Sequence, residues 1–285
     1  MSMAAASGTL YICATPIGNL EDITLRVIRV LREVHVIAAE DTRRTKKLLG
    51  HYDIKTPQIS YHEHNRRARG EELLQRLARG ENIALVSDAG MPGIADPGTE
   101  LVQDAIAAGI PVEVLPGPTA LITALVVSGL PADSFVFAGF PPRRGRERED
   151  YFRSLATEGR TVVFYESPHR LVRTLTDLWE KVGDRWLVVT RELTKYYEEV
   201  RRGPVGQHLT YFQKNDPRGE FCLLLAGLPE EKGEITSARV GEAVDFVAEL
   251  VALGVMKSEA IKLSAREKGL PKRTVYRAVL KEEKK

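Results

Sequence analysis

The sequence predicts an α/β protein with two α/β domains and a small helical module at its C-terminal end. Three observations lead to this prediction. Short apolar segments alternate with helical patterns through most of the chain, loops rich in Gly and Pro follow several of these segments, and the final part contains helical patterns alone. We place an N-terminal α/β domain at residues 1–118, a second α/β domain at 119–230 and the helical module at 236–285.

The N-terminal domain is expected to contain a parallel sheet. A short β-rich run at Thr9–Ala14 leads through a loop with Pro and Gly into a helix, for which Asp22 is the expected N-cap. The order of strand, loop and helix then repeats, and in such sheets ligands bind beyond the carboxyl ends of the strands. The other expected elements are strands at Val34–Ala39, Ile83–Val86 and Pro111–Leu115 and a helix at Glu100–Ala108.

The second domain is expected to contain a more mixed sheet, followed by a linker at Leu228–Glu234, which is polar and contains Pro and Gly. Beyond the linker, valines recur at helical spacing, and two shorter helical patterns lie on either side of Gly269–Pro271. Three short helices of this kind resemble a helix-turn-helix module. The expected strands of the second domain are Phe135–Ala138, Thr161–Tyr165, Trp186–Thr190 and Phe221–Ala226.

Composition excludes several classes of protein. The chain has 285 residues, of which 43% are hydrophobic, and a net charge of +2, as in an ordinary globular protein. Its longest uncharged apolar stretch, Ala120–Gly129, is about half the length that crosses a bilayer, and no signal peptide is apparent, so we expect a cytoplasmic protein without a membrane span. Cys13 and Cys222 lie far apart in apolar runs and are expected to be buried thiols in strands.

Two loops are the strongest candidates for a ligand site. Ser87–Gly98, SDAGMPGIADPG, combines Gly, Pro and Asp after a buried strand, which forces exposed turns whose backbone groups can bind a ligand. Leu115–Ala120 begins a helix, so its unpaired amides face the same edge of the sheet. A plain turn and a Pro-initiated helix cap are the structural alternatives.

Two other chemistries are not supported. Ala14–Asp22 has one Gly where a dinucleotide fingerprint needs three, and it has no Walker Gly-Lys-Ser/Thr, so we exclude hydrolysis of nucleoside triphosphates. His62 and His64 would share one face of a strand, but no second pair of ligands follows at a suitable spacing. We therefore predict that the protein has no metal site.

Basic residues occur in four clusters, which can neutralise the phosphates of an RNA. Solvated helix faces are the alternative for each cluster taken singly. The C-terminal cluster lies on a predicted final helix beside Tyr276, a combination suited to gripping phosphate and stacking on a base. The clusters are Arg43-Arg44-Lys46-Lys47, Arg66-Arg67-Arg69, Arg143-Arg144-Arg146-Arg148 and Lys257–Lys285, and the expected RNA contacts are Arg43, Arg66, Arg143, Arg144, Lys272, Arg273 and Arg277.

A series of motifs runs in order along almost the whole chain: ATPIGNLEDIT at Ala14–Thr24, AAEDTR at Ala38–Arg43, YHEHN at Tyr61–Asn65, SDAGMPGIADPG at Ser87–Gly98, PGP at Pro116–Pro118, SGLP at Ser128–Pro131, YESPHRL at Tyr165–Leu171 and RELTK at Arg191–Lys195. Together they resemble the rRNA cytidine-2′-O-methyltransferase branch of the tetrapyrrole methylase superfamily. The resemblance implies a cleft between two α/β domains that binds S-adenosylmethionine, a homodimer, and methylation of a cytidine in 16S rRNA of the small ribosomal subunit.

The resemblance also implies which residues contact the cofactor. Most of these contacts would be made by backbone or apolar groups, which is consistent with the many Gly, Ala and Pro residues at the matched positions. The chain departs from the branches that methylate porphyrin precursors, because its first loop is ATPIGNLED rather than a glycine-rich segment. The positions carried over are Pro16, Asp88, Ala89, Gly90, Gly93, Ile94, Thr119, Ala120, Tyr165, Leu193, Gly219 and Glu220.

The reaction that the resemblance implies requires a group that removes a proton from a ribose hydroxyl. Asp22, Glu40, Asp41, Glu63, Glu166 and Lys195 are candidates, although Asp22 has an alternative role as an N-cap, and Glu40 or Glu166 as a partner of Arg43 or Arg170. We expect the catalytic centre that faces the RNA to consist of Glu63, His62, His64 and Lys195. Methylation of a tetrapyrrole precursor or of a protein residue, and a non-catalytic ribosome-binding factor, are the rival hypotheses.

Overall fold

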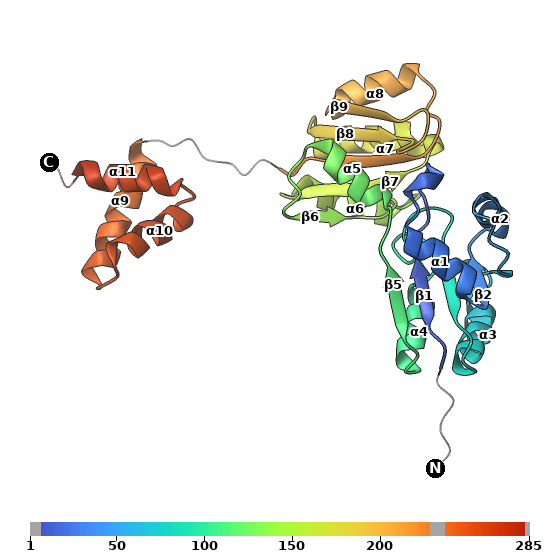
Figure 1. Ribbon diagram of the computed structural model, residues 1–285. Coiled ribbons are helices and arrows are strands. Elements are labelled where there is room, and N and C mark those ends of the chain that lie inside the picture. The colour runs from blue at the N-terminus through green and yellow to red at the C-terminus, as the bar shows by residue number, and fades with distance from the viewer. Residues whose placement is uncertain (1–6, 229–236, 283–285) are drawn as a thin grey trace, which may run out of the picture. The chain divides into compact units, whose positions relative to one another are not determined.

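The computed structural model describes residues 7–228 and 237–282. Residues up to Leu228 form one compact unit, which contains two five-stranded sheets, and the C-terminal helices form a second unit (Figure 1). The two-sheet α/β class is therefore confirmed, whereas the division of the first unit at residue 118 stays a prediction. Within the described part of the chain, none of the helices is both long enough and apolar enough to cross a membrane.

The first sheet is parallel throughout, as the alternating pattern predicted, with strand order β3-β2-β4-β1-β5. Alternate residues of its strands point to opposite faces. One face packs against α1 and α2, and the other against α3 and α4, so both faces are covered and the central strands β1, β2 and β4 consist almost entirely of apolar residues. The strands are β1 (Leu10–Cys13), β2 (Val36–Ala39), β3 (Gln58–Ser60), β4 (Ile83–Val86) and β5 (Val112–Leu115), and the helices are α1 (Leu25–Glu33), α2 (Thr42–His51), α3 (Arg66–Ala78) and α4 (Thr99–Ala107).

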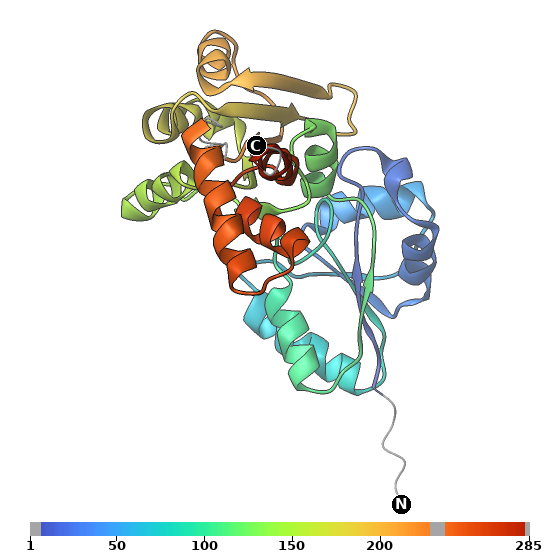
Figure 2. The same cartoon turned by 90° about the vertical axis from the view of Figure 1, so that its left-hand side faces the viewer.

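The second sheet has the order β6-β7-β10-β8-β9, and it is mixed, as predicted. Only β6 and β7 pair in parallel among its described neighbours. Helices α6, α7 and α8 cover one face, and α5 covers part of the other, next to the first sheet (Figures 1 and 2). The strands are β6 (Phe135–Phe137), β7 (Thr161–Glu166), β8 (Trp186–Arg191), β9 (Glu199–Pro204) and β10 (Phe221–Leu225), and the helices are α5 (Ala120–Ser128), α6 (Arg146–Ala156), α7 (Pro168–Val182) and α8 (Val205–Lys214).

The expected N-cap of the first long helix was wrong. Asp22 lies in a short 3-10 helix, η1 (Leu20–Asp22), and Thr24 caps α1 because its Oγ1 accepts a hydrogen bond from the Val27 amide at 3.2 Å. Both thiols lie where they were expected: Cys13 ends β1 and Cys222 lies in β10, and both are buried. Burial raises the pKa of each thiol to about 12, so neither is a nucleophile at neutral pH.

Two edge strands were missed by the sequence prediction, β3 and β9. Both are half exposed, β3 has only three residues, and β9 contains two arginines and a proline, so neither has the apolar pattern of a buried strand. The YHEHN segment was also interpreted as a strand, which was wrong. Only Tyr61 continues the path of β3, and the next four residues form a turn that leads into α3.

The C-terminal unit consists of three helices, α9 (Ser237–Ala252), α10 (Lys257–Glu267) and α11 (Lys272–Glu282), which pack around their own apolar core. Ala243, Val247, Ile261 and Val275 are among the buried residues, and Ser264 Oγ donates a hydrogen bond to the Ala243 carbonyl at 2.7 Å. The predicted linker, Leu228–Glu234, lies outside the described residues except for Leu228.

One arginine of the predicted basic clusters has a structural role. Arg148, in α6, is buried, and its Nε donates a hydrogen bond to Asp177 Oδ2 at 2.7 Å, while its Nη2 donates to Thr174 Oγ1 at 3.0 Å. Thr174 in turn donates to Glu166 Oε2 at 2.6 Å. The assignment of Arg148 to an RNA-binding cluster was therefore wrong, because a buried, hydrogen-bonded guanidinium cannot reach a phosphate.

We predict that Arg148→Ala lowers the free energy of unfolding by about 3 kcal/mol, because it leaves Asp177 without its buried partner. Urea denaturation measures this value. Arg146→Ala is the matched control: its side chain is 92% exposed and lies 3.6 Å from Asp150, so a loss below about 0.5 kcal/mol is expected. Equal losses in the two variants would contradict a structural role for the buried network.

Candidate functional site

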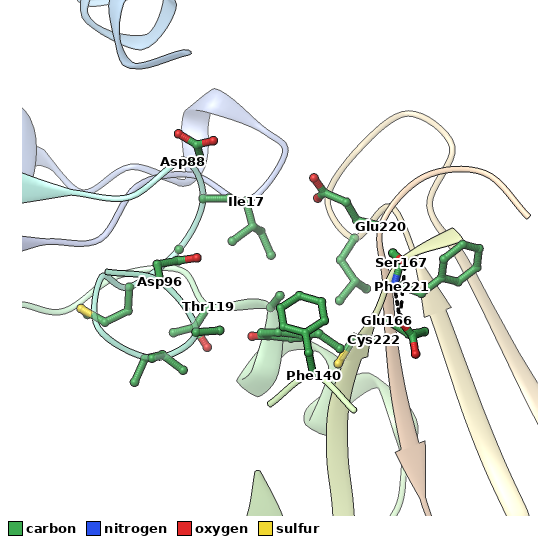
Figure 3. Close-up of a pocket in the computed structure, with 18 of the residues that line it drawn as sticks. Ile17, Asp88, Asp96, Thr119, Phe140, Glu166, Ser167, Glu220, Phe221 and Cys222 are labelled. Carbon is green, nitrogen blue, oxygen red and sulfur yellow. Dashed lines mark hydrogen bonds between the residues drawn. The ribbon is translucent and has the colours of Figure 1, made fainter. Parts of the chain in front are cut away.

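A cavity of about 380 Å³ lies at the carboxyl ends of the parallel strands, between the first sheet and the second. Ile17 follows β1, Asp88 and Asp96 follow β4, and Thr119 follows β5. Glu166 and Phe221 enter from the second sheet. Figure 3 shows the two groups of side chains facing each other across the cavity. Ligand pockets of 300–1,000 Å³ are typical of α/β proteins at this edge, so this cavity is the main candidate site.

The loop at Ser87–Gly98 forms one wall of the cavity, and its glycines allow its shape. Gly90, Gly93 and Gly98 have positive φ angles of 82°, 82° and 153°, which residues with a Cβ atom rarely adopt. The amides of Thr15 and Gly90 each donate to the carbonyl of the other at 2.9 Å, which ties this loop to the end of β1. These two hydrogen bonds anchor the start of this wall to the first sheet.

A second wall is formed by the start of α5. Thr119 is the N-cap, and its Oγ1 accepts a hydrogen bond from the Ile122 amide at 3.2 Å. The preceding segment passes very close to β1, since a Cβ atom on Gly117 would lie 2.7 Å from the Cβ of Ala14. This close approach brings Thr119 and Ala120 to the surface of the cavity.

Three carboxylates make one side of the cavity acidic. Glu40 Oε2 accepts a hydrogen bond from the Asp88 amide at 3.1 Å, and Asp88 Oδ2 lies 3.2 Å from Arg44 Nη1. Burial raises the pKa of Glu40 and of Asp88, and burial together with the charge of Glu40 raises the pKa of Asp96 to about 6. A positively charged ligand in this cavity would be stabilised by these groups.

The opposite side contains an aromatic and apolar surface beside Glu166 and Glu220. Tyr165 packs against Phe137 and Phe140, with ring centroids 5.1 and 5.5 Å apart, and Leu193 completes this surface. Burial raises the pKa of the Tyr165 hydroxyl above its usual range, so the hydroxyl stays protonated at neutral pH. A flat aromatic group of a ligand would fit against this surface.

Glu166 also lines the cavity, but its hydrogen-bonding capacity is used within the protein. Its Oε1 accepts from the Ser167 amide at 2.7 Å and lies 2.7 Å from Arg170 Nη2, as the predicted pairing with Arg170 required. Its Oε2 accepts from Thr174. The alternative pairing of Glu40 with Arg43 was wrong, since Arg43 instead binds Asp41 with a nitrogen–oxygen distance of 2.8 Å.

Comparison with known proteins identifies the family. The model of the tetrapyrrole (corrin/porphyrin) methylases matches residues 9–208. The chain belongs to the tetrapyrrole methylase family.

Two curated relatives and one solved structure illustrate this membership. The chain is 51% identical to ribosomal RNA small subunit methyltransferase I of Synechocystis, over 96% of this chain and 98% of the relative. It is 49% identical to the protein of the same name from Thermotoga maritima, over 77% of this chain and 99% of the relative. The crystal structure of uroporphyrin-III-C-methyltransferase from Thermus thermophilus covers 80% of this chain and 98% of its own, with 25% identity and a TM-score of 0.56.

Most of the residues predicted to contact the cofactor line this cavity. Pro16, Gly93 and Gly219 do not line it. Each is next to a residue that does, and Gly93 shapes the wall by accepting a hydrogen bond from Thr99 Oγ1 at 3.2 Å. The predicted residues that line the cavity are Asp88, Ala89, Gly90, Ile94, Thr119, Ala120, Tyr165, Leu193 and Glu220.

Sequence reasoning missed Asp96 and Phe140 as cavity residues. Asp96 lies in the same Gly/Pro loop as Asp88, so its position in the SDAGMPGIADPG motif was the signal for it. Phe140 follows β6 and shows no local pattern, because its approach to Tyr165 depends on the pairing of β6 with β7.

The residues predicted for catalysis are divided between two places. Glu63 and His64 are exposed in the turn at the start of α3, and His62 lies beside His64 with ring centroids 6.0 Å apart. Glu63 is paired with Arg66 at 3.1 Å. None of these three residues lines the first cavity, but the segment is joined to β2, since the Tyr61 amide donates to the carbonyl of Ala39, the residue before Glu40.

Lys195 lies at the other side of the first cavity and is not suited to act as a base. Its Nζ donates to Glu192 Oε1 at 2.9 Å and to Glu220 Oε2 at 3.0 Å. Burial lowers its pKa, but the two carboxylates outweigh that effect, and the net shift is upward. A lysine held in the protonated form cannot accept a proton, so we assign Lys195 to the ion pairs that hold this part of the chain.

The arginines and lysines predicted to contact RNA lie mostly on the surface. Arg43 and Arg144 are exposed, and Arg66 pairs with both Glu63 and Glu100 at 3.1 Å, which engages its charge. In the C-terminal unit, Val275 and Val279 of α11 face the core, and the basic side chains point outward. The exposed residues of the prediction are Arg43, Arg143, Arg144, Lys272, Arg273 and Arg277.

We predict that Asp96→Asn raises the free energy of unfolding at pH 8 by about 1 kcal/mol, a value reduced for partial solvent exposure, and leaves it unchanged at pH 4. The reason is that the folded state holds the proton of Asp96 up to about pH 6, whereas the unfolded chain releases it near pH 4. The protonated Asp96 side chain therefore contributes to the stability of the wild-type protein at low pH, and this contribution is lost as the pH rises through 6. Urea denaturation at both pH values measures the difference, and an equal effect at pH 4 and pH 8 would contradict burial as the cause.

Proposed function

We infer that this chain is an enzyme that transfers a methyl group from S-adenosylmethionine to the ribose 2′-hydroxyl of a cytidine in 16S rRNA of the small ribosomal subunit. The observation that carries the inference is the motif-lined cavity at the carboxyl edge of a tetrapyrrole methylase fold, in a chain 51% identical to a ribosomal RNA small subunit methyltransferase I. The protein would act in the cytoplasm, where ribosomal subunits are found.

The cavity fits this cofactor chemically. S-adenosylmethionine carries a sulfonium and an ammonium group, and Glu40, Asp88 and Asp96 place negative charge at one wall. Its adenine ring is flat and would find an aromatic surface beside Tyr165 and Phe140. When bound, the cofactor supplies a methyl group on a positively charged sulfur, which is a good electrophile.

The protein's own task is to orient the ribose and to exclude water. The anchored loop around Gly90 and the capped start of α5 fix two sides of the cavity, so a substrate entering between the sheets would be held in one orientation. We propose that His62, Glu63 and His64 face the RNA beside this cavity. A buried His62 Nδ1 that has no hydrogen-bond partner among the described residues supports this, because a bound substrate could supply one.

We propose that the enzyme acts as a homodimer in which a second copy covers α5. This helix is apolar on all sides, yet Ile122 and Val126, one turn apart on the same face, are 46% and 75% exposed. Val114 on the neighbouring edge strand β5 is also exposed. An apolar helix surface of this kind is typical of a protein–protein interface.

The decisive test is transfer of radiolabelled methyl from S-adenosylmethionine to small subunits purified from a strain that lacks the gene. Nuclease mapping should find the label in an alkali-resistant cytidine dinucleotide, which is the signature of a 2′-O-methyl group. Tight cofactor binding without transfer to RNA would favour a tetrapyrrole or protein substrate. Absence of binding as well would favour a non-catalytic ribosome-binding factor.

We predict that Ala120→Phe weakens binding of S-adenosylmethionine by about tenfold or more, because the added ring occupies part of the cavity. Isothermal titration calorimetry measures the affinity. Ala107→Phe is the control, since Ala107 is exposed near the end of α4 and the same ring there should leave the affinity unchanged. Unchanged binding in Ala120→Phe would place the cofactor outside this cavity.

The C-terminal unit is proposed to grip RNA rather than to catalyse. The Thermotoga maritima relative matches along 99% of its own length but over only 220 residues of this chain, so the relative has no room for all three C-terminal helices. In this chain the exposed Lys272, Arg273 and Arg277 lie on one short helix, α11, where they can approach a phosphate backbone together.

We predict that the triple variant Lys272→Ala, Arg273→Ala, Arg277→Ala binds small subunits more weakly and with a smaller dependence on salt. The slope of log affinity against log salt concentration should fall in magnitude by roughly 2. The reason is that the variant neutralises fewer phosphates, so its binding releases fewer counterions. Filter binding at several salt concentrations measures the slope. Lys214→Ala, an exposed charge in α8, is the control, and an unchanged slope in the triple variant would exclude α11 from the contact.

A further inference from the structure

The loop between β8 and β9 displays two adjacent tyrosines almost entirely to solvent. Tyr196 is 92% exposed and Tyr197 is 70% exposed. Their rings are perpendicular, with centroids 5.0 Å apart. Among the large apolar and aromatic side chains of the described residues, Tyr196 has the highest exposure. Two exposed aromatic rings side by side are characteristic of a binding surface.

The loop that carries these rings is tightly held, so their exposure is not a result of a loose chain. Glu192 and Thr194 adopt positive φ angles of 51° and 63°, which residues other than Gly adopt only when neighbouring contacts enforce them. Glu192 Oε1 accepts hydrogen bonds from the Glu220 amide at 2.8 Å and from Lys195. The Thr194 amide donates to Glu198 Oε2 at 2.6 Å.

The same loop is joined to the first sheet at the rim of the cavity. The Asn19 amide donates to Thr194 Oγ1 at 3.0 Å, and Gly18 packs so closely that a Cβ atom there would lie 2.8 Å from the Leu193 carbonyl oxygen. Leu193 and Glu220 line the cavity, and Figure 3 shows Ile17 and Glu220 on its opposite sides. The tyrosines therefore lie within three or four residues of the cavity wall.

The chemistry of the loop favours stacking over phosphate binding. Lys195 is the one cation in residues 192–198. Its ammonium group is already paired with Glu192 and Glu220, so its charge is engaged within the protein. Tyrosine rings can instead stack on the face of any base. A nucleotide whose ribose enters a cavity must leave its own base stack, and its neighbours then lose a stacking partner that an aromatic side chain can replace.

We propose that Tyr196 and Tyr197 form a stacking platform for the unpaired RNA bases that flank the target nucleotide. The proposal rests on the proposed function, since it requires that the substrate is RNA. The platform positions the substrate and takes no part in the chemical step. It gives the segment Leu193–Glu198 at the rim of the cavity a role that the proposed cofactor contacts of Leu193 and Glu220 do not explain.

The test compares the double variant Tyr196→Leu, Tyr197→Leu with Tyr196→Phe, Tyr197→Phe in methyl transfer to small subunits. The leucine variant keeps apolar side chains but loses the rings, so its KM for subunits should rise about tenfold or more, with kcat and cofactor affinity within twofold of wild type. The phenylalanine variant should retain the wild-type KM. Trp186→Leu, an exposed aromatic residue at the other end of β8, is the matched control and should leave KM unchanged.

Three results would overturn the platform. An unchanged KM in the leucine variant would show that the rings do not contact substrate. A change in oligomeric state of that variant, measured by light scattering, would assign the tyrosines to a contact between copies of this chain. An equal rise in KM in the phenylalanine variant would assign the effect to the hydroxyls rather than to stacking. Failure of the wild-type enzyme to methylate subunits would refute the proposed function itself and is distinguishable because it does not depend on the variants.

Discussion

The parallel pairing of β1 with β4 and β5 is the constraint on which the rest of the site depends. Parallel strands end at the same edge, so the loops after these strands must meet there whatever their separation in sequence. The reciprocal backbone hydrogen bonds between Thr15 and Gly90, and the tight contact of Gly117 with Ala14, then fix these loops relative to one another. These contacts hold together the loops that form the wall of the cavity.

The second sheet closes the cavity and adds different chemistry. The first sheet supplies carboxylates at Glu40, Asp88 and Asp96, whereas the second supplies the rings and apolar side chains around Tyr165 together with Glu166 and Glu220. Keeping Asp96 in a partly buried place opposes its ionisation at neutral pH, so the acidic wall lowers the stability of the folded protein. This cost is understandable at a site that binds a positively charged molecule, since functional sites often sacrifice stability for binding.

The proposed contacts with RNA are divided between the two units of this chain. The cavity and the tyrosine loop belong to the unit that ends at Leu228, and the exposed basic face of α11 belongs to the other unit. A relative with the same name from Thermotoga maritima is too short to contain all of both units. The C-terminal helices lie beyond residues 9–208, which the family model matches, and they have an apolar core of their own that includes Val247 and Ile261.

The sequence by itself determined the fold class and the loops that form the walls of the cavity. Buried strands such as β4 can be recognised from the sequence because a strand covered on both faces must be apolar. The Gly/Pro loop after β4 can be recognised because a turn with positive φ favours Gly. Only the tertiary structure decided what lacks a local signal. The edge strands β3 and β9, the buried role of Arg148, the place of Phe140 in the cavity and the protonated state of Lys195 all depend on partners far away in sequence. Charge and hydropathy along the chain cannot reveal such partners, since burial and ion pairing are properties of the folded neighbourhood.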